Sequence, residues 1–162
     1  MIKLIKRPSI GGCITVLGLI LLVVSLIVYG ANVSGAGYFH TLGISSVVTY
    51  SVVGIVFLVL AIAISAFDFG DGLLGKGLRF LADALRIVAA VFIAIALVEF
   101  INGRVEGLAY IYFSDENILA TIQTADNLSS AHSAIAGFIM YGVTAVVLVI
   151  GAFFSLKGKS AE

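Results

Sequence analysis

The stretch that decides the fold runs from Ile10 to Tyr29 and reads IGGCITVLGLILLVVSLIVY, 20 residues without a charged side chain. An α-helix rises about 1.5 Å per residue, so a stretch of this length can cross the hydrocarbon core of a bilayer, which is roughly 30 Å thick. Because lipid offers no hydrogen-bond partner to backbone N–H and C=O groups, a segment at that depth must be helical. The stretch therefore predicts a transmembrane helix over residues 10–30.

Three more apolar segments follow along the chain. Residues 47–67 and residues 131–156 contain no Asp, Glu, Lys or Arg. The third segment is purely apolar over residues 87–98 and reaches spanning length when it is extended to residues 79–102. We expect this helix to stop at Asn102-Gly103, because glycine takes the left-handed conformation at a helix end without strain.

The composition of the 162-residue chain agrees with a lipid environment. Hydrophobic residues make up 61% and charged residues 11% of the chain, against about 25% charged residues in soluble domains. We therefore expect an all-α integral membrane protein, a single domain over residues 1–162, with four transmembrane helices in an antiparallel bundle and the lipid bilayer as its surroundings.

The charge and cysteine content exclude several other classes of protein. A net charge of zero excludes a basic protein that binds nucleic acid. The single cysteine, Cys13, excludes an internal disulfide and a site with several cysteine ligands for a metal or a haem. We expect Cys13 to be a small packing residue.

Lysine and arginine residues set the predicted orientation, because cytoplasmic segments of membrane proteins carry an excess of them. Eight of the nine basic residues lie on one side of the predicted spans, and Arg104 lies on the other. The eight are Lys3, Lys6, Arg7, Lys76, Arg79, Arg86, Lys157 and Lys159. We therefore expect both termini to lie in the cytoplasm, with the plasma membrane as the location.

The largest segment outside the predicted spans is the outer loop, residues 104–130. Residues 108–113, LAYIYF, are expected to form a short strand or a segment among the lipid headgroups. Ser114 is expected to be the N-cap of a short helix that lies on the outer membrane surface or caps the bundle. The loop is acidic, with Glu106, Asp115, Glu116 and Asp126 against Arg104.

Small residues recur at steps of three and four positions along three of the predicted helices. This period of 3.5 residues keeps one face of a helix turned toward its neighbour in a left-handed crossing. Within lipid, helices associate through close backbone approach and small polar side chains. The predicted helix-packing residues are Gly11, Thr15, Gly18, Ser25, Ser51, Gly54, Ala61, Ser65, Gly137, Thr144 and Gly151. The third span shows no such stripe, because its alanines are spread around the helix.

Glu99 is the candidate ion or proton site. A carboxylate at membrane depth is costly and is typical of proton and ion pathways. The alternative is an anchor at the outer interface, where the side chain snorkels or pairs with Arg104. We favour the anchor, because the other three spans carry no charged residue at the midplane, where transporters hold their ion-binding groups.

The sequence contains no convincing catalytic, cofactor-binding or metal-binding set. Residues 70–75 (GDGLLG) match a dinucleotide-binding glycine pattern, but a predicted membrane helix precedes them where that pattern requires a strand. His40 and His132 lack the i, i+4 spacing of helical metal ligands. We therefore expect no enzyme and no cofactor.

Two hypotheses about function remain. The first is a non-enzymatic accessory or scaffold subunit of a membrane complex, bound to other membrane-protein subunits. The second is a small homo-oligomeric channel or a proton-coupled carrier that uses Glu99. We favour the first, because the predicted helices carry packing stripes and a mostly charge-free interior.

Overall fold

A computed structural model describes residues 9–67, 69–70 and 72–156. In these residues it contains five α-helices and no strand. The helices are α1 (Ile10–Ser34), α2 (Ser45–Ala66), α3 (Leu73–Phe113), α4 (Glu116–Ile122) and α5 (Ala125–Ala152). Four of them, α1, α2, α3 and α5, are long and apolar enough to cross a membrane. The prediction of an all-helical membrane protein with four spanning helices is confirmed.

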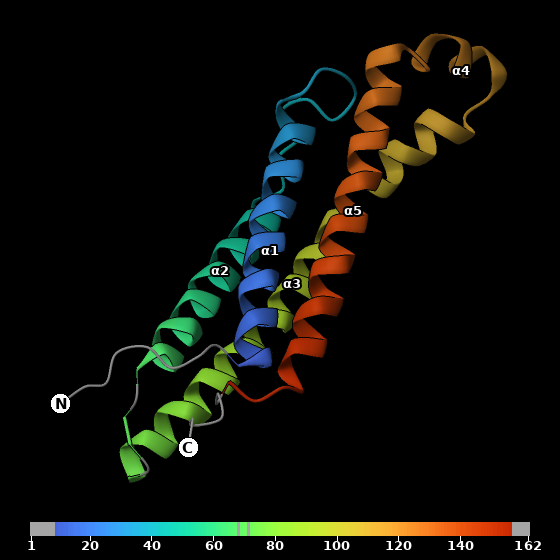
Figure 1. Cartoon of the computed structure of the whole chain (residues 1–162). Coiled ribbons are helices and arrows are strands. Elements are labelled where there is room, and N and C mark those ends of the chain that lie inside the picture. Colours follow the sequence, from blue (N-terminus) through green and yellow to red (C-terminus); the bar gives the residue numbers. More distant parts are fainter. Residues whose placement is uncertain (1–8, 68, 71, 157–162) are drawn as a thin grey trace.

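The four long helices form an elongated bundle (Figure 1). Helix α1 packs against α5 and α2, and α3 packs against α2 and α5. The first turn of α1 meets the chain after α5, where Gly11 lies against the backbone of Phe154. The last turns of α1 meet the start of α5, where Asn32 binds Ser130.

Two arginines on α3 mark the two ends of the bundle, which we call the Arg86 end and the Arg104 end. The two residues are 18 positions apart, which is about 27 Å of helix and close to the roughly 30 Å of a hydrocarbon core. Helix α3 has 41 residues, of which 13 precede Arg86 and nine follow Arg104. It therefore extends past both ends of the spanning region.

Capping side chains explain where α1 and α5 begin. Ser9 Oγ accepts a hydrogen bond from Gly12 N–H at 3.0 Å, and Thr124 Oγ1 accepts one from Asn127 N–H at 3.2 Å. Both bonds satisfy backbone donors that have no partner inside the helix. Helix α5 therefore starts at Ala125, before the predicted span, and takes up the last part of the expected outer loop.

The third helix is longer than the sequence predicts. The expected stop at Asn102-Gly103 is wrong, and so is the expected strand or headgroup segment at residues 108–113, because α3 continues unbroken to Phe113. Gly103 lies close to the Ile44 side chain, and Gly107 lies close to the Phe39 ring. Both glycines lie within α3, where the missing side chain leaves room for a residue packed against the helix. Neither of them forms a left-handed cap.

The short helix in the outer segment exists, but Ser114 is not its N-cap residue. The Ser114 hydroxyl donates to the Tyr110 carbonyl at 2.7 Å, and α4 begins two residues later at Glu116. The Gln123 side-chain amide donates to the Ile111 carbonyl at 3.0 Å and ties α4 back to α3. We call residues 105–128, which contain the end of α3, α4 and the start of α5, the cap.

Apolar side chains also cover the outside of the bundle, as a lipid environment requires. Val48, Val52, Val56 and Val59 form one exposed row along α2. Cys13 is exposed as well, so the expectation that it packs inside is wrong. Gly11 and Thr15 lie one helix turn apart and face the bundle. Cys13 is two positions from each of them and therefore lies on the opposite, outer face of α1.

Candidate functional site

Arg104 has the largest fully buried side chain in the described part of the protein, with 1% of its surface exposed. Its Nε donates to Asn32 Oδ1 at 3.0 Å, and its Nη2 donates to the Leu42 carbonyl at 2.7 Å. The centre of its guanidinium lies 4.6 Å from the centroid of the Phe39 ring. Carbonyl dipoles and an aromatic face thus hold this cation, and no carboxylate contacts it among the described residues.

Asn32 links the Arg104 guanidinium to α5. Its Oδ1 accepts from Arg104, while its Nδ2 donates to the Ser130 carbonyl at 2.9 Å and to Ser133 Oγ at 2.7 Å. An amide side chain can do this because it offers an acceptor and two donors. Three helices, α1, α3 and α5, are therefore joined through one buried side chain.

The segment between α1 and α2 closes over this network. Phe39 is buried, its N–H donates to Ser130 Oγ at 3.1 Å, and its ring lies against Gly107. Gly37 has a positive φ of 104°, and an added Cβ there would clash with the Asp126 carbonyl. A glycine is required at this turn both for its backbone conformation and for the close approach.

Glu99 does not pair with Arg104, so the pairing that we expected as one form of the anchor is wrong. Its Oε2 accepts a hydrogen bond from Ser46 Oγ at 3.0 Å. Ser46 lies in the first turn of α2, where the free N–H groups of a helix favour a negative charge. Glu99 therefore lies beside the positive end of α2, five positions before Arg104 on α3.

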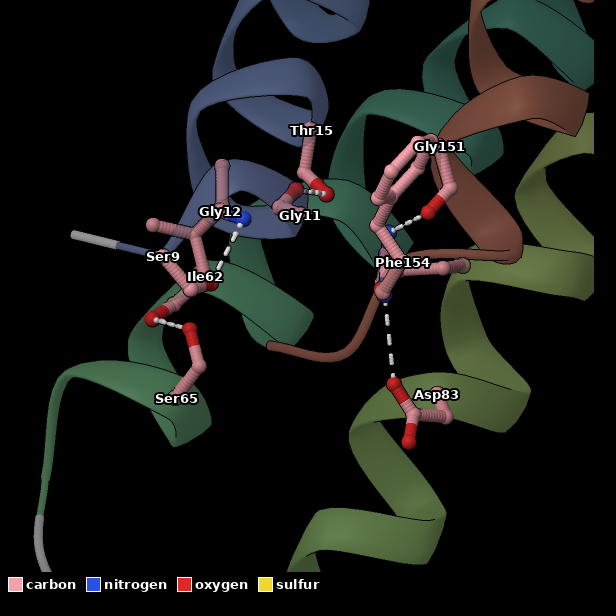
Figure 2. Close-up of polar contacts among 10 residues, drawn as sticks. Ser9, Gly11, Gly12, Thr15, Ile62, Ser65, Asp83, Gly151 and Phe154 are labelled. Atoms are coloured by element: carbon pink, nitrogen blue, oxygen red, sulfur yellow. Dashed lines mark hydrogen bonds and ion pairs between the residues drawn. The ribbon is translucent and has the colours of Figure 1, made fainter. Parts of the chain in front are cut away.

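The Arg86 end carries the second buried arginine, with 3% of its surface exposed. Arg86 donates to the Gly151 carbonyl and, at 3.1 Å, to the Phe154 carbonyl, and it pairs with Asp83 at 3.2 Å. Figure 2 shows this end, with Gly11 of α1 beside Phe154 and with Asp83 on α3. A cation thus binds the Gly151 carbonyl in the last turn of α5 and the Phe154 carbonyl just after it, where the helix dipole is negative.

The predicted packing residues lie mostly at helix contacts. Ten of the eleven are buried, and Ser65 is half-buried with its hydroxyl bonded to the Ile62 carbonyl. An added Cβ at Gly54 would come within 2.8 Å of Ile93 on α3, and one at Gly137 within 2.5 Å of the Phe100 ring. These glycines let neighbouring helices approach closely.

Two hydroxyl pairs bind the helices across the middle of the bundle. Ser25 on α1 lies 3.0 Å from Thr144 on α5, and Ser51 on α2 lies 2.8 Å from the Tyr141 hydroxyl on α5. All four side chains are buried. Each polar atom therefore has a partner at a depth where lipid offers none.

One packing stripe and one polar residue of the structure are not among the predicted residues. Ala82, Ala89 and Ala96 are buried at steps of seven along α3, so the third helix has a stripe too, although we predict none there. Asn32 continues the α1 stripe by a further three positions after Tyr29. Both spacings were present in the sequence and would have indicated these residues.

Comparisons of the chain with protein-family models, with curated proteins and with solved structures found no match. Among the described residues, no group of three or more His, Cys, Asp and Glu side chains could hold a metal ion. The buried polar residues at both ends bind backbone carbonyls of neighbouring segments. These hydrogen bonds hold the helix ends, and the segments that join the helices, in place.

Proposed function

We propose that this protein is a non-enzymatic accessory or scaffold subunit of a membrane complex, which acts by binding other membrane-protein subunits. The observation that carries the proposal is that the buried polar side chains are paired with one another or with the backbone. Every buried side-chain nitrogen and oxygen in the described part of the chain has a hydrogen-bond partner. The buried polar groups therefore serve to hold the helices together. The exposed surfaces remain available for partners.

The contacts of Glu99 favour this proposal over a channel or carrier. A transported ion needs polar groups near the midplane that exchange partners during transport. Near that depth the described polar contacts are pairs between helices, such as Ser51 with Tyr141 and Ser25 with Thr144. Glu99 is likewise bonded to a side chain of another helix, Ser46 of α2, as expected for a structural carboxylate.

The cap supplies a surface for a partner outside the lipid. Its four acidic residues, Glu106, Asp115, Glu116 and Asp126, are all exposed. Gln123 joins α4 to the Ile111 carbonyl of α3. An acidic surface suits a partner with a basic surface, since complementary charges steer and orient association.

Purification of the full chain in mild detergent, followed by native mass measurement, tests the proposal. We expect a stoichiometric complex with an unrelated subunit. Reversing the charges of Asp115 and Glu116 to Lys should remove that subunit, while Asn117→Ser, also exposed on α4, should leave it bound. A homo-oligomer alone, with a pH-gradient-driven flux lost in Glu99→Gln, would instead establish the channel or carrier.

We also propose that both termini face the cytoplasm at the plasma membrane. The support is the sequence, in which eight of the nine Lys and Arg residues lie on one side of the predicted spans. Of these eight, Lys76, Arg79 and Arg86 are described at the Arg86 end of the bundle, and the other five lie outside the described residues. In a Cys13→Ser background, a cysteine at Asp115 should react with an impermeant reagent on intact cells, and a cysteine at Ser160 should not. The opposite labelling pattern would reverse the orientation.

A further inference from the structure

The first 13 residues of α3, Leu73–Leu85, extend beyond the last turn of α5 at the Arg86 end (Figure 1). We call them the α3 extension. We propose that the α3 extension binds anionic phospholipid headgroups of the adjacent leaflet, with its apolar face in the acyl region. This site is independent of the proposed accessory role, which concerns the opposite end of the bundle.

The outer face of the α3 extension is apolar and unusually exposed. Leu73, Leu74 and Phe80 have 90%, 82% and 77% of their surface exposed. Gly75 and Ala82, on the opposite side of the helix, are buried. In water, three such side chains would leave a large apolar surface uncovered, which soluble surfaces avoid.

This apolar face is continuous with the lipid-facing side of α3. Positions 73, 77, 80, 84, 87 and 91 follow one another at steps of four and three, and Ile87 and Val91 are exposed on the membrane-spanning part. From Leu73 to Val98 the face covers about 39 Å of helix, which exceeds a hydrocarbon core of roughly 30 Å. A helix whose apolar face is longer than the hydrocarbon core tilts. Tilting brings the α3 extension into the headgroup region of the adjacent leaflet.

The basic side chains indicate which lipid the α3 extension prefers. Lys76 is exposed, and Arg79 is half-exposed and also donates to the Gly70 carbonyl. Both lie on one flank of the apolar face, where an interfacial helix meets phosphate groups. The acid on that flank, Asp83, is paired with Arg86. Basic residues beside a membrane attract anionic lipids at about 1 kcal/mol each, or about fivefold in affinity.

The experiment uses a tryptophan probe, because the chain contains no tryptophan. Phe80→Trp in the full chain is reconstituted into phosphatidylcholine vesicles that contain phosphatidylglycerol, and either lipid is brominated in turn to quench the probe. Phe113→Trp is the matched control, because Phe113 is also on α3, is 85% exposed, and lies in the acidic cap. Circular dichroism and thermal unfolding confirm that each variant is folded.

We expect brominated phosphatidylglycerol to quench Trp at position 80 more strongly than brominated phosphatidylcholine at equal mole fraction. Lys76→Gln should lower that preference about fivefold, and Lys76→Gln with Arg79→Gln should lower it further. The probe at position 113 should show no preference. Equal quenching by both lipids at position 80 would overturn the proposal. Protection from both lipids, growing with the protein-to-lipid ratio, would also overturn it and identify a second copy of the chain as the occupant.

Discussion

Arg104 Nε donates to Asn32 Oδ1 at 3.0 Å, although the two residues are 72 positions apart and lie on different helices. The same Asn32 side chain donates onward to the Ser130 carbonyl of α5. A buried cation is usually balanced by an acid, because an isolated charge is expensive to bury. Here amide and carbonyl oxygens take that role, so the Arg104 network depends on the exact positions of three helices and of the segment that follows α1.

Replacing Arg104 by lysine should destabilise the protein by about 2 kcal/mol. A lysine ammonium cannot reach the two acceptors, Asn32 Oδ1 and the Leu42 carbonyl, with the planar geometry of a guanidinium, and a buried acceptor without a donor costs about 1–3 kcal/mol. Unfolding in mild detergent measures the change. Glu106→Gln, two residues along and exposed, is the control and should stay within about 0.5 kcal/mol. Equal losses in the two variants would refute the role of Arg104.

The hydrogen bond between Ser51 and Tyr141 should show a measurable coupling energy. We expect a double-mutant cycle of Ser51→Ala and Tyr141→Phe to give about 0.6 kcal/mol, the average for side-chain hydrogen bonds between membrane helices. Thr15→Val combined with Tyr141→Phe is the control cycle, because Thr15 bonds within α1 to the Gly11 carbonyl. That pair should be additive within about 0.3 kcal/mol, half of the expected coupling. The pairing would be refuted by a Ser51 cycle that is equally additive.

Two glycines of α5 should respond to alanine with opposite signs. An added Cβ at Gly137 would lie 2.5 Å from the Phe100 ring, whereas one at Gly142 would have nothing within 4 Å. Gly137→Ala should therefore destabilise the bundle by about 1–3 kcal/mol through overpacking. Gly142→Ala should stabilise it by about 0.5–1 kcal/mol, because alanine is the better helix former. Thermal unfolding of both variants in the same detergent checks the signs, and a shared sign would contradict the packing.

Glu99→Gln should cost at most about 1 kcal/mol. The glutamine carbonyl oxygen can still accept from Ser46, so the replacement mainly removes a charge beside the first turn of α2. Ser46→Ala should cost a similar amount, since it removes the other half of the same bond. Unfolding in detergent gives the stabilities, and proteoliposomes under a pH gradient give the flux. A flux in the native protein that disappears in Glu99→Gln would show that Glu99 couples protons.

Replacing Arg86 by leucine should loosen the end of α5. The variant loses the donors to the Gly151 and Phe154 carbonyls, and one hydrogen bond to a charged group contributes roughly 1.5 kcal/mol, or about tenfold in an equilibrium. Hydrogen exchange at the Phe153 and Phe154 amides should accelerate by about that factor. Asp83→Asn should change it little, because the Asp83 side chain is about half exposed and exposed ion pairs contribute little. Faster exchange in both variants alike would assign the effect to the ion pair.

The sequence by itself determined the class of the protein and the number of spanning helices. Uninterrupted apolar runs leave no choice of secondary structure in lipid, because each backbone polar group must be bonded within its own helix. The 3.5-residue spacing of small residues in α1, α2 and α5 also marked ten residues that are buried. Such local rules act within one helix, so they can be read without knowing its neighbours.

The tertiary structure alone decided where the charged residues lie. The sequence places Arg104 in an outer loop beside Glu99, but the structure buries it against Asn32 and Phe39. It also gives Gly103 and Gly107 packing roles inside α3, where the sequence suggests a helix end. These outcomes depend on residues from helices far apart in the chain. An arginine or a glycine has the same local preferences in a loop and in a bundle, and the neighbours that fold against it decide between the two.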